Sequence, residues 1–130
     1  MKHPPIHKDN SPYFSFYISQ LQNELKCSKS QYNSFGKYAY RNQEDILEAV
    51  KPLLSKHGLS LFIKDDIVNI EGRFYIKATC ILVDTEDGTT IENSALARKS
   101  ENKKGMEDAQ ITGSTSSYAR KYALNGLFLI

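Results

Sequence analysis

The first part of the chain carries apolar residues at helical spacing and then loses any clear period. Ser11 and Pro12 form a pair that is typical of a helix start, and apolar residues then recur at helical spacing to about Lys26. The next stretch, SKSQYNSFGKYAYRNQ, mixes turn-forming residues, aromatic rings and cations, and we interpret it as an ordered loop. Residues 1–11 are polar and contain prolines, so we expect them to form a flexible N-terminal arm.

The helical pattern returns after this loop. A second helix is predicted to begin near Asn42 or Gln43 and to end at Gly58, which is placed as its C-terminal cap. Pro52 lies inside the predicted helix. Proline lacks a backbone donor and clashes with the preceding turn, so we expect a kink or a break near Lys51.

From Leu59 the apolar spacing changes to two residues, which is typical of strands. Three antiparallel strands are predicted, at residues 59–70, 73–83 and 89–98, with turns at Glu71-Gly72 and in DTEDG. Adjacent carboxylates at Asp65 and Asp66 suggest a bulge in the first of them. In the second strand the alternation predicts a core face of Phe74, Ile76, Ala78, Cys80 and Leu82, and a wet face of Arg73, Tyr75, Lys77 and Thr79.

The last segment, MEDAQITGSTSSYARKYALNGLFLI, is predicted to form a helix that ends at about Leu124. Its small residues 113–117 are expected to let the helix lie close to the sheet. Tyr118 and Tyr122 are four residues apart, and we interpret them as core residues. The order of helix, helix, three antiparallel strands and helix predicts an α+β domain, with helices packed on the apolar face of a three-stranded antiparallel sheet, over residues 12–130.

Charge is unevenly distributed along the chain. The net charge of +2 and the pI of about 8.5 lie below the range of an obvious nucleic-acid-binding protein. Residues 1–42 carry six Lys or Arg and two Asp or Glu, and residues 95–130 carry six and three, whereas residues 60–94 carry three and seven. If the fold joins the basic ends, they form a positive groove, and the acidic segment can meet a neighbouring subunit. Ordinary solvated charge is the alternative.

Several kinds of chemistry lack their motifs in this sequence. The GxxxxGK[ST] loop of nucleotide-binding proteins and the GxSxG elbow of hydrolases do not occur, and Cys27 and Cys80 form no CxxC pair. Neighbouring strand residues point to opposite faces, so Asp65 and Asp66 do not suggest a magnesium site, and we interpret His57 as a helix-end residue. No run approaches the roughly 18 apolar residues of a membrane helix. We expect a cytoplasmic protein that is not an enzyme and uses no cofactor or metal.

Cations next to aromatic residues are the strongest chemical signal. They alternate in FGKYAYR, residues 35–41, and in YARKY, residues 118–122. Cations can hold phosphates and rings can stack on bases, which is typical of single-strand binding. Tyr40 is the expected stacking ring, and the expected phosphate contacts are Lys37, Arg41, Arg98, Lys99, Lys103, Lys104, Arg120 and Lys121, with Lys77 a further candidate on the wet sheet face.

Three stretches carry a resemblance to a known family: NSFGKYAYRNQEDILEAVKPLLSKHGLSLF, GRFYIKATCILVD and ARKSENKKGMEDAQITGSTSSYARKYALNGLFLI. They resemble the Erf (essential recombination function) family of phage single-strand annealing proteins, over about residues 12–130. The last stretch is the most specific. The family's motif positions correspond here to Lys37, Tyr38, Tyr40 and Arg41, and to Gln110, Gly113, Ser114, Ser117, Tyr118, Arg120 and Lys121.

This resemblance implies an annealing-recombinase-like core that forms an oligomeric ring or helical filament. Single-stranded DNA would lie in a positively charged groove, with its bases left free for pairing. A phage exonuclease and the host single-strand-binding protein are the implied partners, in the cytoplasm of a bacterial host cell. Family members carry a further C-terminal tail, and because this chain stops at LFLI we expect a truncated form or one that lacks the tail.

The sequence thus leads to a functional hypothesis with two rivals. We expect a single-stranded DNA-binding protein that promotes ATP-independent annealing of complementary strands in phage homologous recombination. A passive protein that protects single strands without pairing them is the first alternative. An interaction module, whose charges serve only contacts between subunits, is the second.

Overall fold

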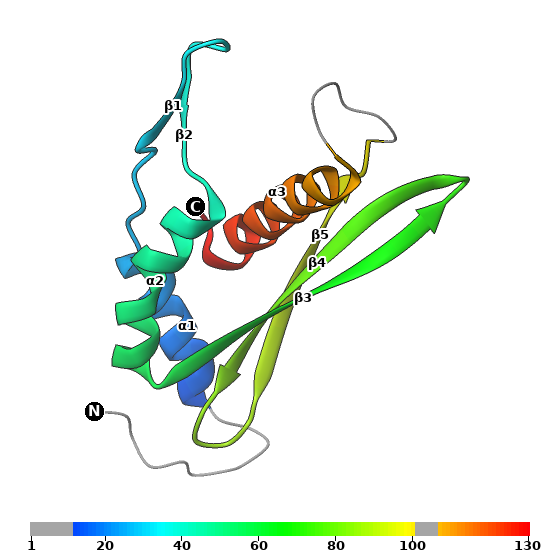
Figure 1. The fold of residues 1–130 in the computed structure, drawn as a ribbon. Helices are drawn as coiled ribbons and strands as arrows, with labels where there is room; N and C mark the ends of the chain where they lie inside the picture. The colour runs from blue at the N-terminus through cyan, green and yellow to red at the C-terminus, as the bar shows by residue number, and fades with distance from the viewer. Residues whose placement is uncertain (1–11, 101–106) are drawn as a thin grey trace.

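A computed structural model describes residues 12–100 and 107–130, which form three helices and two antiparallel sheets (Figure 1). In chain order the elements are α1 (Pro12–Glu24), β1 (Gln31–Asn33), β2 (Tyr38–Tyr40), α2 (Gln43–His57), β3 (Leu59–Ile70), β4 (Arg73–Asp84), β5 (Thr90–Arg98) and α3 (Asp108–Phe128). This arrangement confirms the predicted α+β class and the three predicted strands. The N-terminal arm expected at residues 1–11 lies outside the described residues.

The main sheet has the order β3-β4-β5, with both pairs antiparallel. Glu71 and Gly72 connect β3 to β4, and both have positive φ angles, 51° and 82°. Positive φ at both positions matches the twist of the flanking strands, so this turn sets the register directly. The register stays continuous from Leu59 opposite Asp84 to Ile70 opposite Arg73. The long β3–β4 hairpin extends beyond the helices at its tip (Figure 1).

The bulge predicted at Asp65 and Asp66 is wrong. Asp65 pairs with Ala78 and Asp66 pairs with Lys77 in the unbroken register. Regular alternation directs Asp65 to the helix side and Asp66 to the opposite side. Each carboxylate therefore meets a favourable neighbour without any distortion of the strand, because Asp65 binds Arg120 and Asp66 lies opposite a lysine.

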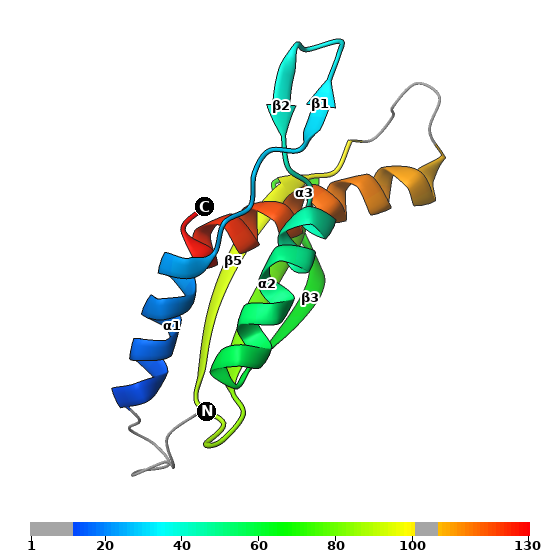
Figure 2. The ribbon, with the colours of Figure 1, turned by 90° about the vertical axis from the view of Figure 1, so that its left-hand side faces the viewer.

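All three helices lie on one side of the sheet (Figures 1 and 2). The helix α3 crosses β4 and β5, while α2 packs against β3 and α3, and α1 packs against α2. The core combines four residues of the predicted face of β4, Ile76, Ala78, Cys80 and Leu82, with apolar side chains from each helix; its completely buried members include Leu21, Ile46, Val50, Cys80, Leu82, Leu124 and Phe128. The prediction is wrong for Phe74, which is 48% exposed near the tip of the hairpin beyond the helices, and for Thr79, which is predicted on the wet face but is buried and hydrogen-bonded to Ser94. None of the described helices lies on the opposite sheet face, and Lys77 on that face is exposed, as predicted.

The helix α2 is capped at both ends and runs without a break through Pro52. The Asn42 side chain accepts a hydrogen bond from the Asp45 amide, and the Asp45 carboxylate accepts one from the Asn42 amide. Gly58 ends the helix in the left-handed conformation, at φ 65°. Such caps each contribute about 1 kcal/mol. Together with buried Ile46 and Val50 they hold the helix across the proline, and the predicted break is wrong.

The helix α3 is longer than predicted and approaches the sheet at other residues. It continues past Leu124 because Leu127 and Phe128 are buried. The small residues packed against the sheet are Ala119 and Ala123, both completely buried, so the closest approach lies beyond the expected residues 113–117, of which Thr115 is buried. Gly113 is exposed and a Cβ atom there would meet nothing within 4 Å.

The predicted loop between α1 and α2 contains a short hairpin, β1–β2, which projects from the helices (Figure 2). At its turn the Asn33 side chain accepts a hydrogen bond from the Gly36 amide at 2.9 Å, and Lys37 adopts a positive φ of 56°. At its base Gln31 donates to the Asp45 carboxylate at 3.3 Å. Local turn contacts therefore order a stretch in which the sequence shows no alternation.

Candidate nucleic-acid interface

Four tyrosines form a row that passes from the β1–β2 hairpin onto α3. The rings of Tyr38 and Tyr40 on β2 lie 5.9 Å apart, and those of Tyr118 and Tyr122 on α3 lie 6.5 Å apart and nearly parallel, at 23°. The Lys121 Nζ atom joins the two pairs, at 5.6 Å from the Tyr40 and Tyr118 rings and 5.5 Å from Tyr122. We call these four residues the tyrosine row.

The row follows from strand and helix geometry. Tyr38 and Tyr40 are two apart on a strand, so their side chains point the same way. Tyr118 and Tyr122 are four apart on a helix and lie one above the other. Both are 51% exposed, as Tyr38 is at 50%, so the interpretation of Tyr118 and Tyr122 as core residues is wrong. Ala119 and Ala123, which directly follow the two tyrosines, are completely buried and face the sheet instead, and this turns the rings toward solvent.

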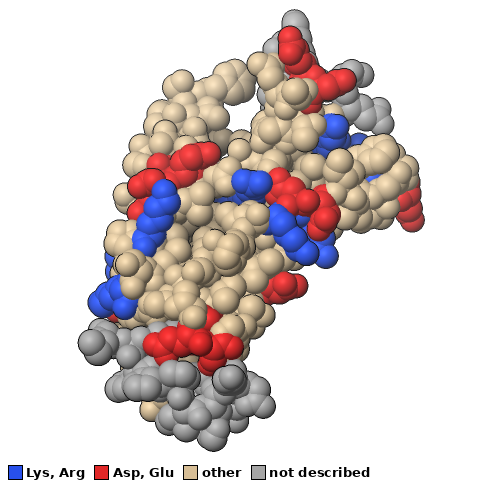
Figure 3. Space-filling model, turned by 60° about the horizontal axis from the view of Figure 1, so that its bottom comes forward, with Lys and Arg blue, Asp and Glu red and all other residues tan. Residues whose placement is uncertain are grey.

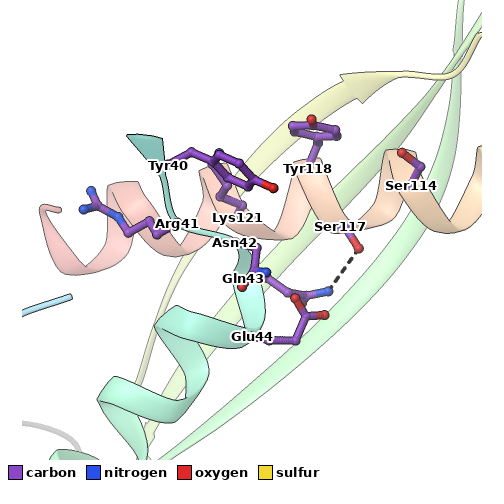
Figure 4. A pocket seen from close by; sticks show the side chains of 9 residues that line it. All are labelled: Tyr40, Arg41, Asn42, Gln43, Glu44, Ser114, Ser117, Tyr118 and Lys121. Carbon is purple, nitrogen blue, oxygen red and sulfur yellow. Dashed lines mark hydrogen bonds between the residues drawn. The ribbon is translucent and has the colours of Figure 1, made fainter. Parts of the chain in front are cut away.

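A pocket of about 280 Å³ opens beside the row, between β2, the start of α2 and α3 (Figure 4). Its walls combine polar, aromatic and charged side chains from these elements: Tyr40, Arg41, Asn42, Gln43, Glu44, Ser114, Ser117, Tyr118 and Lys121. Gln43 and Ser117 face each other across it, with 3.4 Å between Gln43 Nε2 and Ser117 Oγ (Figure 4). Segments far apart in the sequence therefore build one concave site.

Two further pockets continue from the first one along α3 toward the end of β5. The second, of about 310 Å³, lies between α3 and β5 and shares Ser114 and Tyr118 with the first. The third, of about 260 Å³, shares Arg98 with the second, and its walls also include Arg73, Phe74, Lys99 and Asp108. We call the three pockets together the α3 groove. It brings together four predicted binding residues, Tyr40, Arg98, Lys99 and Lys121, with Arg41 at its rim.

Three cations of the groove form no ion pair with any other described residue. Between the described residues, the ion pairs join Glu48 to Lys51, Glu24 to Lys56 and His57, and Asp65 to Arg120. Arg98, Lys99 and Lys121 take part in none of these pairs, so their charges are available to an anionic ligand. Elsewhere the signs are mixed, since the face drawn in Figure 3 intersperses basic and acidic side chains without a large field of either.

Two other predicted contacts are engaged by groups of the protein itself. Arg120 faces β3, where its Nε and one terminal nitrogen donate to the two oxygens of Asp65, each at 3.1 Å. Arg41 points away from Gln43 and Ser117 (Figure 4) and donates to the Cys27 carbonyl at 2.9 Å.

The remaining predicted cations are also dispersed. Lys77 occupies the sheet face opposite α3, and Lys37 is exposed at the hairpin turn. Lys103 and Lys104 lie outside the described residues. The structure thus brings part of the predicted set together and disperses the rest.

The remaining ionisable groups of interest lie outside the groove. His57, in the last turn of α2, is buried, with its Nε2 atom 3.3 Å from Glu24 Oε1 and its ring 6.0 Å from that of Tyr17. Glu24 also accepts a hydrogen bond from Lys56, and this bond is the main reason why the pKa of Glu24 is lowered. Within residues 12–100 and 107–130, no three His, Cys, Asp or Glu side chains gather into a possible metal site.

This architecture defines a class: an α+β protein in which a helix lying on an antiparallel sheet carries an aromatic and basic groove. The chain belongs to the ERF superfamily, whose sequence model matches residues 15–130. It is 57% identical over 118 residues to the essential recombination function protein of Salmonella phage P22. The alignment covers 91% of this chain and 56% of the phage P22 protein, so the chain spans little more than half of that relative.

These matches confirm the family resemblance predicted from the sequence. No solved structure matches the chain. Among the described residues, none of the helices combines the length and the apolar character needed to cross a membrane.

Proposed function

We propose that this protein binds single-stranded DNA along the α3 groove and promotes ATP-independent annealing of complementary strands in phage recombination. The observation that carries the proposal is the half-exposed tyrosine row beside the unpaired cations Lys121, Arg98 and Lys99. Tyrosine faces stack on bases of any identity, and cations neutralise the phosphates between them. The name of the phage P22 relative, essential recombination function protein, supports the recombination role.

Annealing of this kind needs no covalent step, because formation of the duplex lowers the free energy by itself. In a ring or filament of protomers, many α3 grooves would act on one strand, and multivalency would turn modest single-site affinity into tight binding. Holding two strands close together also shortens the search for complementary bases. An exonuclease that exposes single strands is the kind of partner that this activity requires.

Strand binding can be tested by the fluorescence anisotropy of a labelled thymidine oligonucleotide at several salt concentrations. Tyr118→Leu is expected to weaken binding about tenfold, since stacking on one base contributes about 1–3 kcal/mol. Lys121→Gln is expected to reduce the slope of log affinity against log salt by about 0.7, the loss of one phosphate contact. Lys51→Gln is the matched control, because Lys51 is exposed on α2 and borders none of the groove pockets.

Annealing is measured separately, from energy transfer between two complementary strands that carry a donor and an acceptor dye. The protein is expected to accelerate duplex formation without ATP, and Tyr118→Leu and Lys121→Gln should slow it. Binding without acceleration would identify a passive single-strand-binding protein instead. Failure to bind any strand at low salt would contradict the proposed function as a whole.

A further inference from the structure

Gln43 is a buried polar side chain whose hydrogen bonding is incomplete. It is the first residue of α2, it is only 9% exposed, and it borders the first pocket of the α3 groove. Its Nε2 atom donates to Ser117 Oγ, but its Oε1 atom is buried without a hydrogen-bond partner. A buried acceptor without a donor costs about 1–3 kcal/mol, so a ligand that supplies the donor would be bound favourably.

The surroundings of Gln43 fit a flat ligand with a polar edge. The rings of Tyr40 and Tyr118 lie at equal distances from Lys121 Nζ, 5.6 Å, so their centroids are separated by no more than twice that distance. The two rings can offer their faces while the amide of Gln43 meets the edge. A phosphate does not suit this position, because the Glu44 carboxylate also borders the pocket and like charges repel. The phosphate belongs beside Lys121.

We propose that the pocket receives a base of the bound strand and that Gln43 contacts the edge of that base. This inference rests on the proposed function and extends it from the strand to the nucleobase. The Ser117 hydroxyl can either accept or donate, so the amide can rotate and present Oε1 to a base amino group or Nε2 to a base carbonyl. Gln43 is thus a tolerant contact that holds a base of any identity, and bases between successive pockets stay free to pair.

The first test compares the affinity for a deoxycytidine oligomer with that for an abasic oligomer of equal length. The wild-type protein is expected to bind the base-bearing oligomer more tightly. In Gln43→Leu, which keeps the bulk but makes no hydrogen bond, the ratio of the two affinities should fall about fivefold, as expected for one hydrogen bond. An unchanged ratio in this variant would overturn the inference, whereas failure of the wild type to bind either oligomer would overturn the proposed function.

A second variant tests whether the Gln43 amide rotates, and it provides an independent test if Gln43→Leu does not fold. Gln43→Glu can only accept, so it should bind deoxycytidine oligomers, which carry an amino group, about tenfold more tightly than thymidine oligomers, since a charged acceptor strengthens the bond. The wild type should differ between them far less. Equal preference in wild type and Gln43→Glu would contradict the inference. Circular dichroism melting establishes that each variant is folded.

A third arm separates a base within a strand from a free nucleotide. Deoxycytidine monophosphate is titrated alone and in competition with the labelled strand. Weak competition that Gln43→Leu abolishes is expected, since one base lacks the support of neighbouring phosphates. If deoxycytidine monophosphate binds tightly and the strand does not displace it, the inference is overturned and the pocket is a nucleotide site.

Discussion

The ion pair with Asp65 determines the role of Arg120. The sequence places Arg120 next to Lys121 and suggests the same phosphate-binding role for both, but a helix directs adjacent residues to different sides. Lys121 lies within the tyrosine row, whereas Arg120 faces β3 and is held through two hydrogen bonds by Asp65. With the side chains of both partners no more than a third exposed, the pair fixes α3 on the sheet.

This difference predicts opposite effects for two neighbouring substitutions. Arg120→Gln is expected to lower the free energy of unfolding by about 1 kcal/mol, as for a partly exposed but doubly bonded pair, and to change strand affinity little. Lys121→Gln should weaken strand binding and leave stability nearly unchanged. Urea denaturation and anisotropy measure the two properties. An equal loss of strand affinity in both variants would show that Arg120 also contacts the strand.

The two cysteines are predicted to differ in reactivity. Burial raises the pKa of the Cys80 thiol to about 11, whereas Cys27 is partly exposed and its pKa is raised, mainly by desolvation. The thiolate is the reactive species, so a thiol reagent at about pH 8 should modify Cys27 first and Cys80 only on unfolding. Peptide mass spectrometry measures the order. Fast labelling of the folded Cys27→Ser variant would show that Cys80 is accessible.

At the scale of elements, two glycines of α3 predict a contrast within one helix. A Cβ atom at Gly113 would meet nothing, whereas one at Gly126 would lie 2.5 Å from Asn93 Nδ2. Asn93 donates to the Ala123 carbonyl at 2.9 Å and so ties β5 to α3. Gly113→Ala is expected to raise the free energy of unfolding by about 0.5–1 kcal/mol, because alanine favours the helix. Gly126→Ala should give no such gain, since it displaces Asn93. Urea denaturation of both variants measures the difference, and an equal gain would contradict this contact.

The link between α1 and α2 predicts a dependence of stability on pH. The hydrogen bond from Lys56 holds the pKa of Glu24 below its ordinary value of 4.5. A carboxyl group with a lowered folded-state pKa stabilises the protein above the unfolded value, and this contribution is lost as the pH falls through the folded value. Wild type should therefore lose more stability than Glu24→Gln below about pH 4.5, measured by urea midpoints across that range. Equal losses of stability in wild type and Glu24→Gln below about pH 4.5 would contradict a stabilising contact between Glu24 and Lys56.

At the scale of the whole molecule, the sheet separates two surfaces. Lys77 pairs with Leu96 and lies on the sheet face away from α3. Alternation directs Arg98 the same way, but Arg98 is the last residue of β5 and there borders the α3 groove. A strand in the groove passes Arg98 and does not extend along the sheet to Lys77. Arg98→Gln is expected to lower the salt slope of strand binding by about 0.7 and Lys77→Gln to leave it unchanged. Equal reductions would show that the strand also covers the sheet face away from α3.

The sequence predicts the elements better than it predicts the site. Alternating apolar residues identify β4, and Gly58 marks the end of α2, because these signals act between near neighbours. The exposure of Tyr118 depends on how α3 is rotated against the sheet, and the state of Arg120 depends on Asp65. Gln43 has no signal in the sequence, since its burial arises from a helix far along the chain. The features that the sequence patterns do not predict depend on contacts between residues that are far apart in the sequence.

The tyrosine row has a further consequence for biosynthesis. Its two halves belong to β2 and α3, and more than half of the chain separates them. A ribosome releases β2 long before α3, so an unfinished polypeptide displays only Tyr38 and Tyr40. The complete surface exists only after the final helix has docked, so a nascent chain presents no more than one half of the row.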